Sequence, residues 1–316
     1  MEVHFGLDDI PQLQHSVITV GSFDGVHSGH RKIIEGLLYH ATRYETQSVL
    51  VTFHPHPRLV LNRFDQSLRM LNTLDEKIVV FKSLGVDHVV VVPFTPEFAS
   101  QSPKDYIEDF LIKYFKPKAV VIGYDHQFGK GRVGTKDILL ELQSIYHYEV
   151  YQIDAFEIDG TTVSSTKIRN ALSIGDFDLA KKLLGYPFPI SGRIVPGDRL
   201  GRQMGFPTAN IMINDASKMI PKHGVYAVRM KWKEYVKEGM MYIGLRPTTH
   251  PKGELQIEVN IFDFDGELYG EQTWVEVLRF IRDDMKFSDP SSLMAQIKKD
   301  QVAIKNYFAN ESLQNT

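Results

Sequence analysis

The sequence contains no cysteine and no apolar run long enough to cross a membrane. Without cysteine there can be no disulfide, no cysteine-ligated zinc and no thiol nucleophile, which is compatible with a cytoplasmic protein. Every apolar run is shorter than the ~18–20 residues that a membrane span requires. Residues 1–9 are acidic and lack an apolar core, so we expect no signal peptide and no membrane partner.

The chain also lacks internal repeats, low-complexity segments and a large net charge. Its formal net charge of -3 gives no support for nucleic-acid binding. Its 316 residues, 43% of them hydrophobic and 24% charged, are typical of soluble globular domains and sufficient for two. We expect a monomer or a weak homo-oligomer.

Apolar segments and helical patterns alternate over the first half of the chain. The segments are apolar throughout rather than at every second position, which is typical of a parallel sheet covered on both faces. This predicts a Rossmann-like α/β domain whose ligands bind at the carboxyl ends of the strands. The expected strands are residues 17–20, 47–53, 87–94, 118–123 and 149–154, and helices are expected at 75–84, 103–115 and 137–146.

The pattern changes near Tyr186. Short strand-like runs follow, punctuated by glycine, proline and aspartate, and a single helical segment comes after them. This predicts a small antiparallel β-barrel with a C-terminal helix, and domains of residues 1–186 and 187–316. The expected barrel strands are 190–195, 224–230, 239–243, 256–262 and 274–280, and the helix is 291–308.

The segment 21–30, GSFDGVHSGH, joins the first expected strand to a helix. Its glycines allow close approach of a ligand to the backbone, and His27 and His30 lie three residues apart, on one helix face. The unpaired N–H groups and positive dipole end of a helix N-terminus suit a phosphate. We therefore expect phosphate-transfer chemistry in which two imidazoles stabilise charge developing on phosphorus.

This segment resembles the HxGH signature of nucleotidylyltransferases. More narrowly, it is similar to the first motif of bacterial bifunctional riboflavin kinase/FAD synthetases, and the resemblance extends over about residues 19–308. It implies a nucleotidylyltransferase-like domain in which His27 and His30 are catalytic. The residues implied to bind ATP and its phosphates there are Gly21, Phe23, Asp24, Gly29, Ser164, Ser165, Thr166 and Arg169.

The segment 163–169, VSSTKIR, matches the family motif that holds the ATP phosphates. Lys167 and Arg169 fall in the first turn of an expected helix, where a cation is unfavourable unless an anion binds there. This local conflict independently indicates an anion site, although a plain capped helix is the simpler alternative.

The segment 52–57, TFHPHP, follows the second expected strand. With His27 and His30, its histidines could suggest a metal cluster, but no cysteine and no neighbouring acid is available for zinc. His56 matches the family, which implies a flavin contact, whereas His54 replaces the usual glutamate.

The segment 123–134, GYDHQFGKGRVG, contains G-x-G-x-x-G, with Asp154 twenty residues on, and so imitates a dinucleotide-binding fingerprint. Its first glycine lies six residues beyond the strand instead of in the tight turn, which disfavours an NAD-dependent oxidoreductase. The segment instead resembles a family motif that implies flavin binding by Asp125 and Phe128. His126 replaces the usual phenylalanine. Because histidine titrates near neutrality, we expect His54 or His126 to make FAD synthesis pH-dependent between about 5.5 and 7.5.

The segment 192–210, rich in glycine and arginine, resembles the riboflavin kinase signature. The resemblance implies Mg²⁺ near Thr208 and Asn210, and hydroxyl and amide oxygens are hard ligands that suit this ion. The residues implied to bind ATP and flavin in this domain are Gly192, Gly197, Gly201, Gly205, Pro207 and Arg246.

Glu258 shares the polar face of an alternating strand with Gln256 and Asn260. The pattern alone favours an ordinary solvent-facing glutamate, whereas the family match implies the base of the kinase. We interpret Asp263, Asp265 and Glu267 as structural residues of the following turn.

Two activities are implied: phosphorylation of riboflavin to FMN by ATP, and adenylylation of FMN to FAD with release of pyrophosphate, both with Mg²⁺. One alternative is a riboflavin kinase with weak or lost FAD synthetase activity. Another is a non-catalytic flavin carrier, but a carrier has no need of an intact His27, His30 and Glu258.

Overall fold

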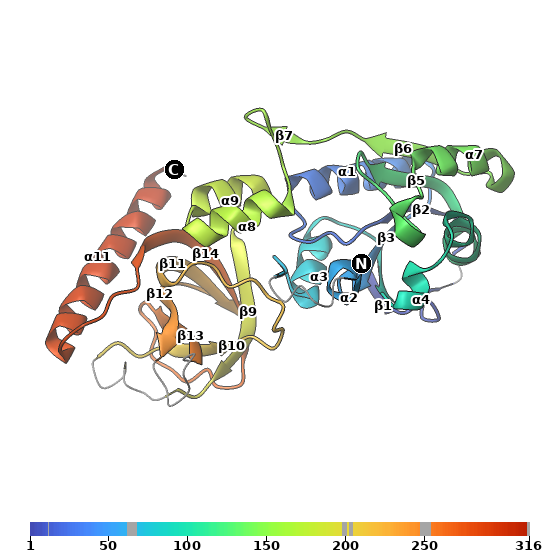
Figure 1. The fold of residues 1–316 in the computed structure, drawn as a ribbon. Coiled ribbons are helices and arrows are strands. Elements are labelled where there is room, and N and C mark those ends of the chain that lie inside the picture. The colour runs from blue at the N-terminus through green and yellow to red at the C-terminus, as the bar shows by residue number, and fades with distance from the viewer. Residues whose placement is uncertain (12, 62–67, 198–200, 202–204, 247–253, 315–316) are drawn as a thin grey trace. The chain divides into compact units, whose positions relative to one another are not determined.

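The computed structural model describes residues 1–11, 13–61, 68–197, 201, 205–246 and 254–314 (Figure 1). The chain forms two compact units, Met1–Ser165 and Thr166–Thr316. The predicted fold class, a parallel α/β domain followed by an antiparallel barrel and a C-terminal helix, is confirmed.

The first unit contains a six-stranded parallel sheet with the order β1-β4-β3-β2-β5-β6. The chain runs outward from β2 through β3 to β4 and then returns to place β5 on the other side of β2. The order therefore reverses between β2 and β5, and ligands of such sheets bind at that point, beyond the carboxyl ends of the strands. The strands are β1 (Glu2–Phe5), β2 (Ser16–Val20), β3 (Gln47–His54), β4 (His88–Pro93), β5 (Pro117–Gly123) and β6 (Glu149–Ile153).

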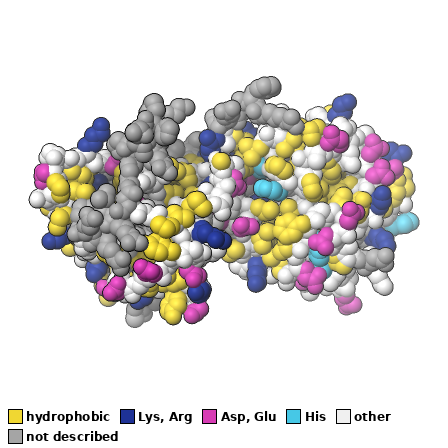
Figure 2. Space-filling model, turned by 90° about the horizontal axis from the view of Figure 1, so that it is seen from below, with side chains coloured by type: hydrophobic (Ala, Val, Ile, Leu, Met, Phe, Trp, Pro, Cys, Tyr) yellow, Lys and Arg dark blue, Asp and Glu magenta, His cyan; other side chains and the backbone are white. Residues whose placement is uncertain are grey.

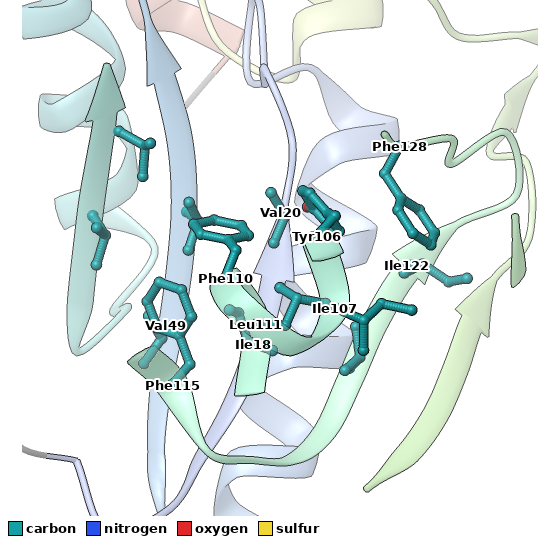
Figure 3. Packing of buried hydrophobic residues seen from close by; sticks show 14 of the residues in the cluster. Ile18, Val20, Val49, Tyr106, Ile107, Phe110, Leu111, Phe115, Ile122 and Phe128 are labelled. Atoms are coloured by element: carbon teal, nitrogen blue, oxygen red, sulfur yellow. The ribbon is translucent and has the colours of Figure 1, made fainter. Parts of the chain in front are cut away.

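Helices cover both faces of this sheet. On one face α1 lies so close that a Cβ at Gly36 would be 2.8 Å from the side chain of Ile153 and 3.5 Å from that of Val121. On the other face Phe110, Leu111 and Phe115 pack over the inward-facing residues of the central strands (Figure 3). The principal helices are α1 (Ser28–Arg43), α3 (Leu74–Ser83), the consecutive α5 (Pro103–Asp105), η1 (Tyr106–Ile112) and α6 (Lys113–Phe115), and α7 (Lys136–Tyr146).

Shorter elements complete the first unit. These are α2 (Pro57–Leu61), α4 (Pro96–Ala99), the 3-10 turn η2 (Lys130–Arg132) and the hairpin of β7 (Glu157–Ile158) with β8 (Thr161–Thr162). The expected helix at 103–115 is continuous but π-helical in its middle part. The edge strand β1 was missed, because an alternating four-residue segment carries little apolar signal.

The second unit is a closed antiparallel barrel with the strand order β10-β13-β12-β11-β14-β9, in which β9 pairs with β10. Its short strand β10 begins at the end of the glycine-rich segment and was not predicted. The strands are β9 (Phe188–Val195), β10 (Ala209–Met212), β11 (Gly224–Trp232), β12 (Tyr235–Arg246), β13 (Glu254–Ile261) and β14 (Gln272–Asp283).

The helices of this unit whose bounds lie in the described residues are α8 (Ser165–Ile174), α9 (Phe177–Leu184) and α11 (Pro290–Gln314). The helix α9 packs on β14 and β9. Ile304 and Phe308 of α11 share a buried cluster with Val225 and Leu278 of the barrel. None of the helices in the described residues is long and apolar enough to span a membrane.

Figure 2 shows the charged side chains on one face of the molecule. Among the residues coloured there, Lys and Arg are interspersed with Asp and Glu. This distribution agrees with the small net charge of -3.

Candidate functional sites

His27 and His30 form a stacked pair at the beginning of α1. His27 is the N-cap residue, and its Nδ1 accepts a hydrogen bond from the backbone N–H of His30 at 3.3 Å. The two rings lie parallel within 13°, with their centroids 3.6 Å apart. The structure thus brings the two imidazoles together beside the helix N-terminus, next to the end of β2.

The environment of His30 keeps its imidazole neutral at physiological pH. Burial, and then the charges of His27 and Lys77, hold the pKa of His30 well below its ordinary value. Its Nδ1 is buried and has no hydrogen-bond partner among the described residues. An anion beside the ring would raise this pKa, because it favours the charged form.

The turn between β2 and α1 has a strained backbone. Phe23 and Val26 adopt positive φ angles of 47° and 35°, which are uncommon for residues with side chains and cluster at functional sites. The buried side-chain carboxylate of Asp24 accepts a hydrogen bond from the backbone N–H of Leu71 at 2.8 Å. The backbone carbonyl of Asp24 accepts one from Ser165 Oγ at 2.9 Å. Asp24 therefore fixes the turn through at least two contacts.

Two glycines make room for the rings of this site. A Cβ at Gly21 would lie 3.1 Å from the ring of Phe23, and one at Gly29 would lie 3.3 Å from the ring of His27. Larger residues would displace these rings, so the glycines of the motif maintain its geometry.

Lys77 of α3 belongs to this site and was missed in the sequence. Its buried Nζ donates hydrogen bonds to the carbonyl of Ser22 and to Oγ1 of Thr52, both at 3.2 Å. Burial lowers the pKa of Lys77 to about 8, although the charge of Asp24 opposes this shift. The sequence contained one signal: Lys77 occupies an apolar position of the helix, three and four residues before the buried Val80 and Phe81.

The segment after β5 carries the predicted flavin-binding residues Asp125 and Phe128. Asp125 is exposed, whereas Phe128 is buried and stacks on Tyr106 with a centroid distance of 4.8 Å (Figure 3). Phe128 also exchanges backbone hydrogen bonds with Gly134. Phe128 thus supports the loop that carries Asp125, and flavin contact by either residue stays a prediction.

The glycines of this segment do not form a dinucleotide-binding turn. Gly129 and Gly131 have positive φ angles of 70° and 64° around the short turn η2. Gly134 lies against the ring of Phe128, where a Cβ would be 2.5 Å from the nearest ring atom. The segment is therefore a folded-back loop and not a direct strand-to-helix connection.

The expectation that His126 titrates near neutrality is wrong. Burial lowers the pKa of His126 to about 4; the charge of Asp125 opposes this shift and that of Arg132 adds to it. His126 is therefore neutral throughout the range in which we expected a response.

The remaining predicted residues of this activity lie in two loops and on α8. His56 is half-buried, and its Nδ1 accepts a hydrogen bond from the N–H of Arg58 at 3.1 Å. Ser164 is half-buried and precedes α8. Thr166 and Arg169 lie on α8, in the second unit.

In the barrel, Glu258 faces two residues of the glycine-rich segment. Glu258 on β13 is the direct cross-strand partner of Asn210 on β10. Thr208, just before β10, donates a hydrogen bond from Oγ1 to Glu258 Oε2 at 3.0 Å. All three side chains are half-buried. The structure therefore brings together the predicted base and both residues predicted to lie near the metal.

The backbone around these residues is closely packed. A Cβ at Gly197 would lie 2.2 Å from the amide nitrogen of Asn210, and one at Gly201 would lie 2.4 Å from the carbonyl of Phe206. Gly192 is similarly enclosed by Met212. A Cβ at Gly197 would displace the Asn210 side chain, whereas one at Gly192 or Gly201 would meet the backbone of a neighbouring segment.

Asn260 is a further residue of this site. Its side chain is buried, and its Nδ2 donates a hydrogen bond to the carbonyl of Pro207 at 2.8 Å. It thereby fixes the chain immediately before Thr208. Nearby, Gly205 adopts a φ of 81°, a conformation that favours glycine. The side chain of Arg246 lies outside the described residues.

A pocket of about 780 Å³, including its open mouth, lies between β10 and the turn after β13. Thr208 and Asn210 line it, together with Phe264 and Tyr269 of that turn. Asp265 and Glu267, which we interpreted as structural, also line this pocket. The turn is therefore part of the site's surface.

Together, the parallel α/β unit with its imidazole pair and the barrel with its carboxylate define a two-site transferase of phosphate-containing groups. The FAD synthetase family model matches residues 9–167, and the riboflavin kinase family model matches residues 184–308. A bifunctional riboflavin kinase/FMN adenylyltransferase from Bacillus subtilis is 38% identical over 298 residues, which cover 93% of each chain. The corresponding protein of Escherichia coli K12 is 36% identical over 96% of this chain and 95% of its own length.

A solved structure from Streptococcus pneumoniae, titled macrolide-efflux protein, matches with a TM-score of 0.86 and 30% identity. It covers 97% of this chain and 99% of its own. The chain belongs to the family of bifunctional riboflavin kinase/FMN adenylyltransferases, whose activities are phosphorylation of riboflavin to FMN and adenylylation of FMN to FAD.

Proposed function

We propose that the two reactions take place at two separate sites, FMN adenylylation at the start of α1 and riboflavin phosphorylation between β10 and β13. The observation that carries the first assignment is the stacked pair of His27 and His30 beside a helix N-terminus. The second rests on the hydrogen bond between Thr208 and Glu258.

In FMN adenylylation, a phosphate oxygen of FMN attacks the α-phosphorus of ATP. The bond from this phosphorus to the oxygen that bridges the α- and β-phosphates breaks, and pyrophosphate leaves. Because such displacements need mainly positioning and charge stabilisation, His27 and His30 act as hydrogen-bond donors to the transition state. Ser164, Ser165, Thr166 and Arg169 hold the phosphates of ATP and the leaving pyrophosphate.

In riboflavin phosphorylation, the ribityl 5′-oxygen attacks the γ-phosphorus of ATP and ADP leaves. A primary alcohol is a weak nucleophile at neutral pH, so a carboxylate that accepts its proton accelerates the attack. Glu258 is held within β13 and accepts a hydrogen bond from the Thr208 hydroxyl, so its carboxylate has a defined position from which to receive that proton.

The donor atoms around Glu258 fit Mg²⁺. Thr208 and Asn210 offer a hydroxyl and an amide oxygen beside a carboxylate, and hard oxygen donors are what this ion prefers. Thr208 and Asn210 would hold the ion, which would neutralise charge on the ATP phosphates when bound. The loop containing Gly197 lies against Asn210 and can approach those phosphates with its backbone.

One experiment tests both assignments. Each variant is incubated with riboflavin, ATP and Mg²⁺, or with FMN, ATP and Mg²⁺, and the flavins are resolved by chromatography. We expect a His27 and His30 double alanine variant to stop at FMN, and Glu258→Gln to make FAD only from added FMN. Loss of both activities in either variant, with the fold intact, would contradict two separate sites.

We also propose that the protein works in the cytoplasm as a monomer or weak homo-oligomer, without a nucleic-acid partner. The absence of cysteine and the interspersed charges of Figure 2 support this. Light scattering after size-exclusion chromatography measures the oligomeric state directly.

A further inference from the structure

Three potential metal ligands meet at the edge of the parallel sheet, away from the histidine pair of α1. Strand β1 pairs with β4 in a register that sets Glu2 opposite His88, and His4 lies two residues further along β1. His4 and His88 are buried, whereas Glu2 is exposed. His88 is the first residue of β4, so this cluster lies at the amino ends of the strands, opposite to the nucleotide site.

The three ligand atoms are close to one another. His4 Nε2 and His88 Nδ1 are 3.0 Å apart. The Oε2 atom of Glu2 lies 3.6 Å from His88 Nδ1 and 3.9 Å from His4 Nε2. Ligand atoms at the corners of a tetrahedral zinc site are about 3.3 Å apart, because zinc–nitrogen bonds measure about 2.0–2.1 Å. The observed separations bracket this value.

The tautomer of His4 also suits a metal. Its Nδ1 lies 2.9 Å from the backbone carbonyl of Asp9, and a carbonyl oxygen can only accept, so Nδ1 carries the proton. The lone pair of neutral His4 is therefore on Nε2, which faces His88 and Glu2. Metal-ligating histidines are usually oriented by such a hydrogen bond from the other ring nitrogen.

We propose that Glu2, His4 and His88 bind a divalent transition-metal cation, for which zinc is the best fit. Two imidazoles and one carboxylate are an established ligand set for zinc, and they leave a fourth position for water. Mg²⁺ is a poor candidate because it prefers oxygen ligands. The ion would join the edge strand β1 to β4 and would therefore act on stability rather than on catalysis.

Without the metal, a hydrogen bond from His88 Nδ1 to His4 Nε2 satisfies these two nitrogens, whereas the buried Nε2 of His88 has no hydrogen-bond partner among the described residues. The sequence alone did not reveal this cluster, because His4 and His88 are 84 residues apart and meet only through β1, the strand that was not predicted.

The full-length protein, freed of metal with a chelator, is titrated with Zn²⁺ by calorimetry and with Co²⁺ by visible absorption. We expect one Zn²⁺ per chain, tetrahedral Co²⁺ bands and a higher Tm with Zn²⁺. His4→Gln and His88→Gln should each weaken Zn²⁺ binding at least about 100-fold and abolish the Tm increase, and Glu2→Gln should weaken it about 10-fold.

The matched control is His15→Gln, since His15 is exposed and outside the cluster; it should bind Zn²⁺ like the parent. Glu2→Gln is the variant least expected to disturb the fold, because Glu2 is exposed. This variant should phosphorylate riboflavin and adenylylate FMN at parental rates. The proposal is overturned if the parent shows no saturable Zn²⁺ binding, or if binding survives undiminished in His4→Gln and His88→Gln. Octahedral Co²⁺ bands would equally overturn the assigned geometry.

Discussion

Thr208 Oγ1 donates a hydrogen bond to Glu258 Oε2 at 3.0 Å, although the two residues are 50 positions apart in the chain. The contact exists because β10 and β13 pair with Asn210 directly opposite Glu258. A residue of the glycine-rich segment thus orients the proposed base of the kinase.

Glu258→Gln should lower the rate of FMN formation by ~10²–10⁴, the range for loss of a general base, because it keeps the shape but removes the basic oxygen. Flavin chromatography measures this rate. Adenylylation of added FMN by the same variant is the control for folding. Riboflavin phosphorylation within threefold of the parent would refute the assignment.

Thr208→Val should also slow FMN formation, because it removes the hydroxyl that orients Glu258, whereas Thr208→Ser retains it. We expect about a tenfold or larger loss in Thr208→Val and near-parental activity in Thr208→Ser. The comparison is made from steady-state rates of ADP release. Equal activity in both variants would show that the hydroxyl contributes nothing.

His27 has a structural role and a proposed catalytic role that substitution can separate. Its Nδ1 caps α1, and its ring, stacked on His30, is the proposed donor to the transition state. His27→Asn retains a good helix cap, whereas His27→Ala loses both the cap and the imidazole. We expect both variants to lose ~10²–10³ in FAD formation, the scale for one lost transition-state donor.

Thermal unfolding should distinguish the same two variants. Only His27→Ala should be destabilised, by about 1 kcal/mol, which is the typical value of a cap. Parental FAD synthesis in His27→Asn would show that His27 serves the helix and not the reaction.

Lys77 should make the stability of the first unit depend on pH. Its pKa is about 8 in the folded protein, well below the value of 10.5 for a solvated lysine, so between these values the unfolded chain binds more protons. Stability therefore rises with pH across this window, by about 3 kcal/mol in total, whereas at lower pH the cost of burying the charged Lys77 is constant and adds no pH dependence.

Lys77→Met should remove this rise, and Lys82→Met, an exposed lysine on the same helix, should not. Urea unfolding at several pH values measures the difference. Both tryptophans, Trp232 and Trp274, lie in the second unit, so their fluorescence reports the barrel while circular dichroism reports both units. Parallel pH curves for Lys77→Met and the parent would contradict the shifted pKa.

The sequence was sufficient for the parallel sheet because each central strand is a short apolar run between helical segments. The sequence was insufficient where the burial or the pKa of a residue is set by neighbours that are distant in sequence. Lys77 is buried against Ser22 and Thr52, and the low pKa of His126 comes from burial that local pattern does not reveal. Likewise β10 is only four residues long and is stabilised by pairing with β9 and β13.

The helices α8 and α9 lie at the end of the first predicted domain, but from Thr166 onward they belong to the second compact unit. Phe177 of α9 is buried and its ring contacts Tyr226 of β11 with a centroid distance of 5.2 Å. Leu183 and Leu184 are also buried. Yet Thr166 and Arg169, proposed to hold phosphates for adenylylation, lie on α8 just before them. The stretch 166–184 therefore contains buried residues that pack on the barrel. It also contains Thr166 and Arg169, the motif residues proposed to act in FMN adenylylation.

We therefore expect residues 166–316 to fold and to form FMN at a rate near that of the full chain. Residues 187–316, the domain predicted from the sequence, lack α9 and should be less stable, because the surface around Tyr226 becomes exposed. Phe177→Ala in the full chain should reproduce this loss, costing about 3–5 kcal/mol for a buried phenylalanine.

Conversely, residues 1–186 should form FAD from FMN better than residues 1–165, which lack Thr166 and Arg169. Tryptophan fluorescence during urea unfolding measures the barrel, and flavin chromatography measures both activities. Equal stability of 166–316 and 187–316 would show that α9 contributes nothing to the barrel and would favour the boundary at Tyr186.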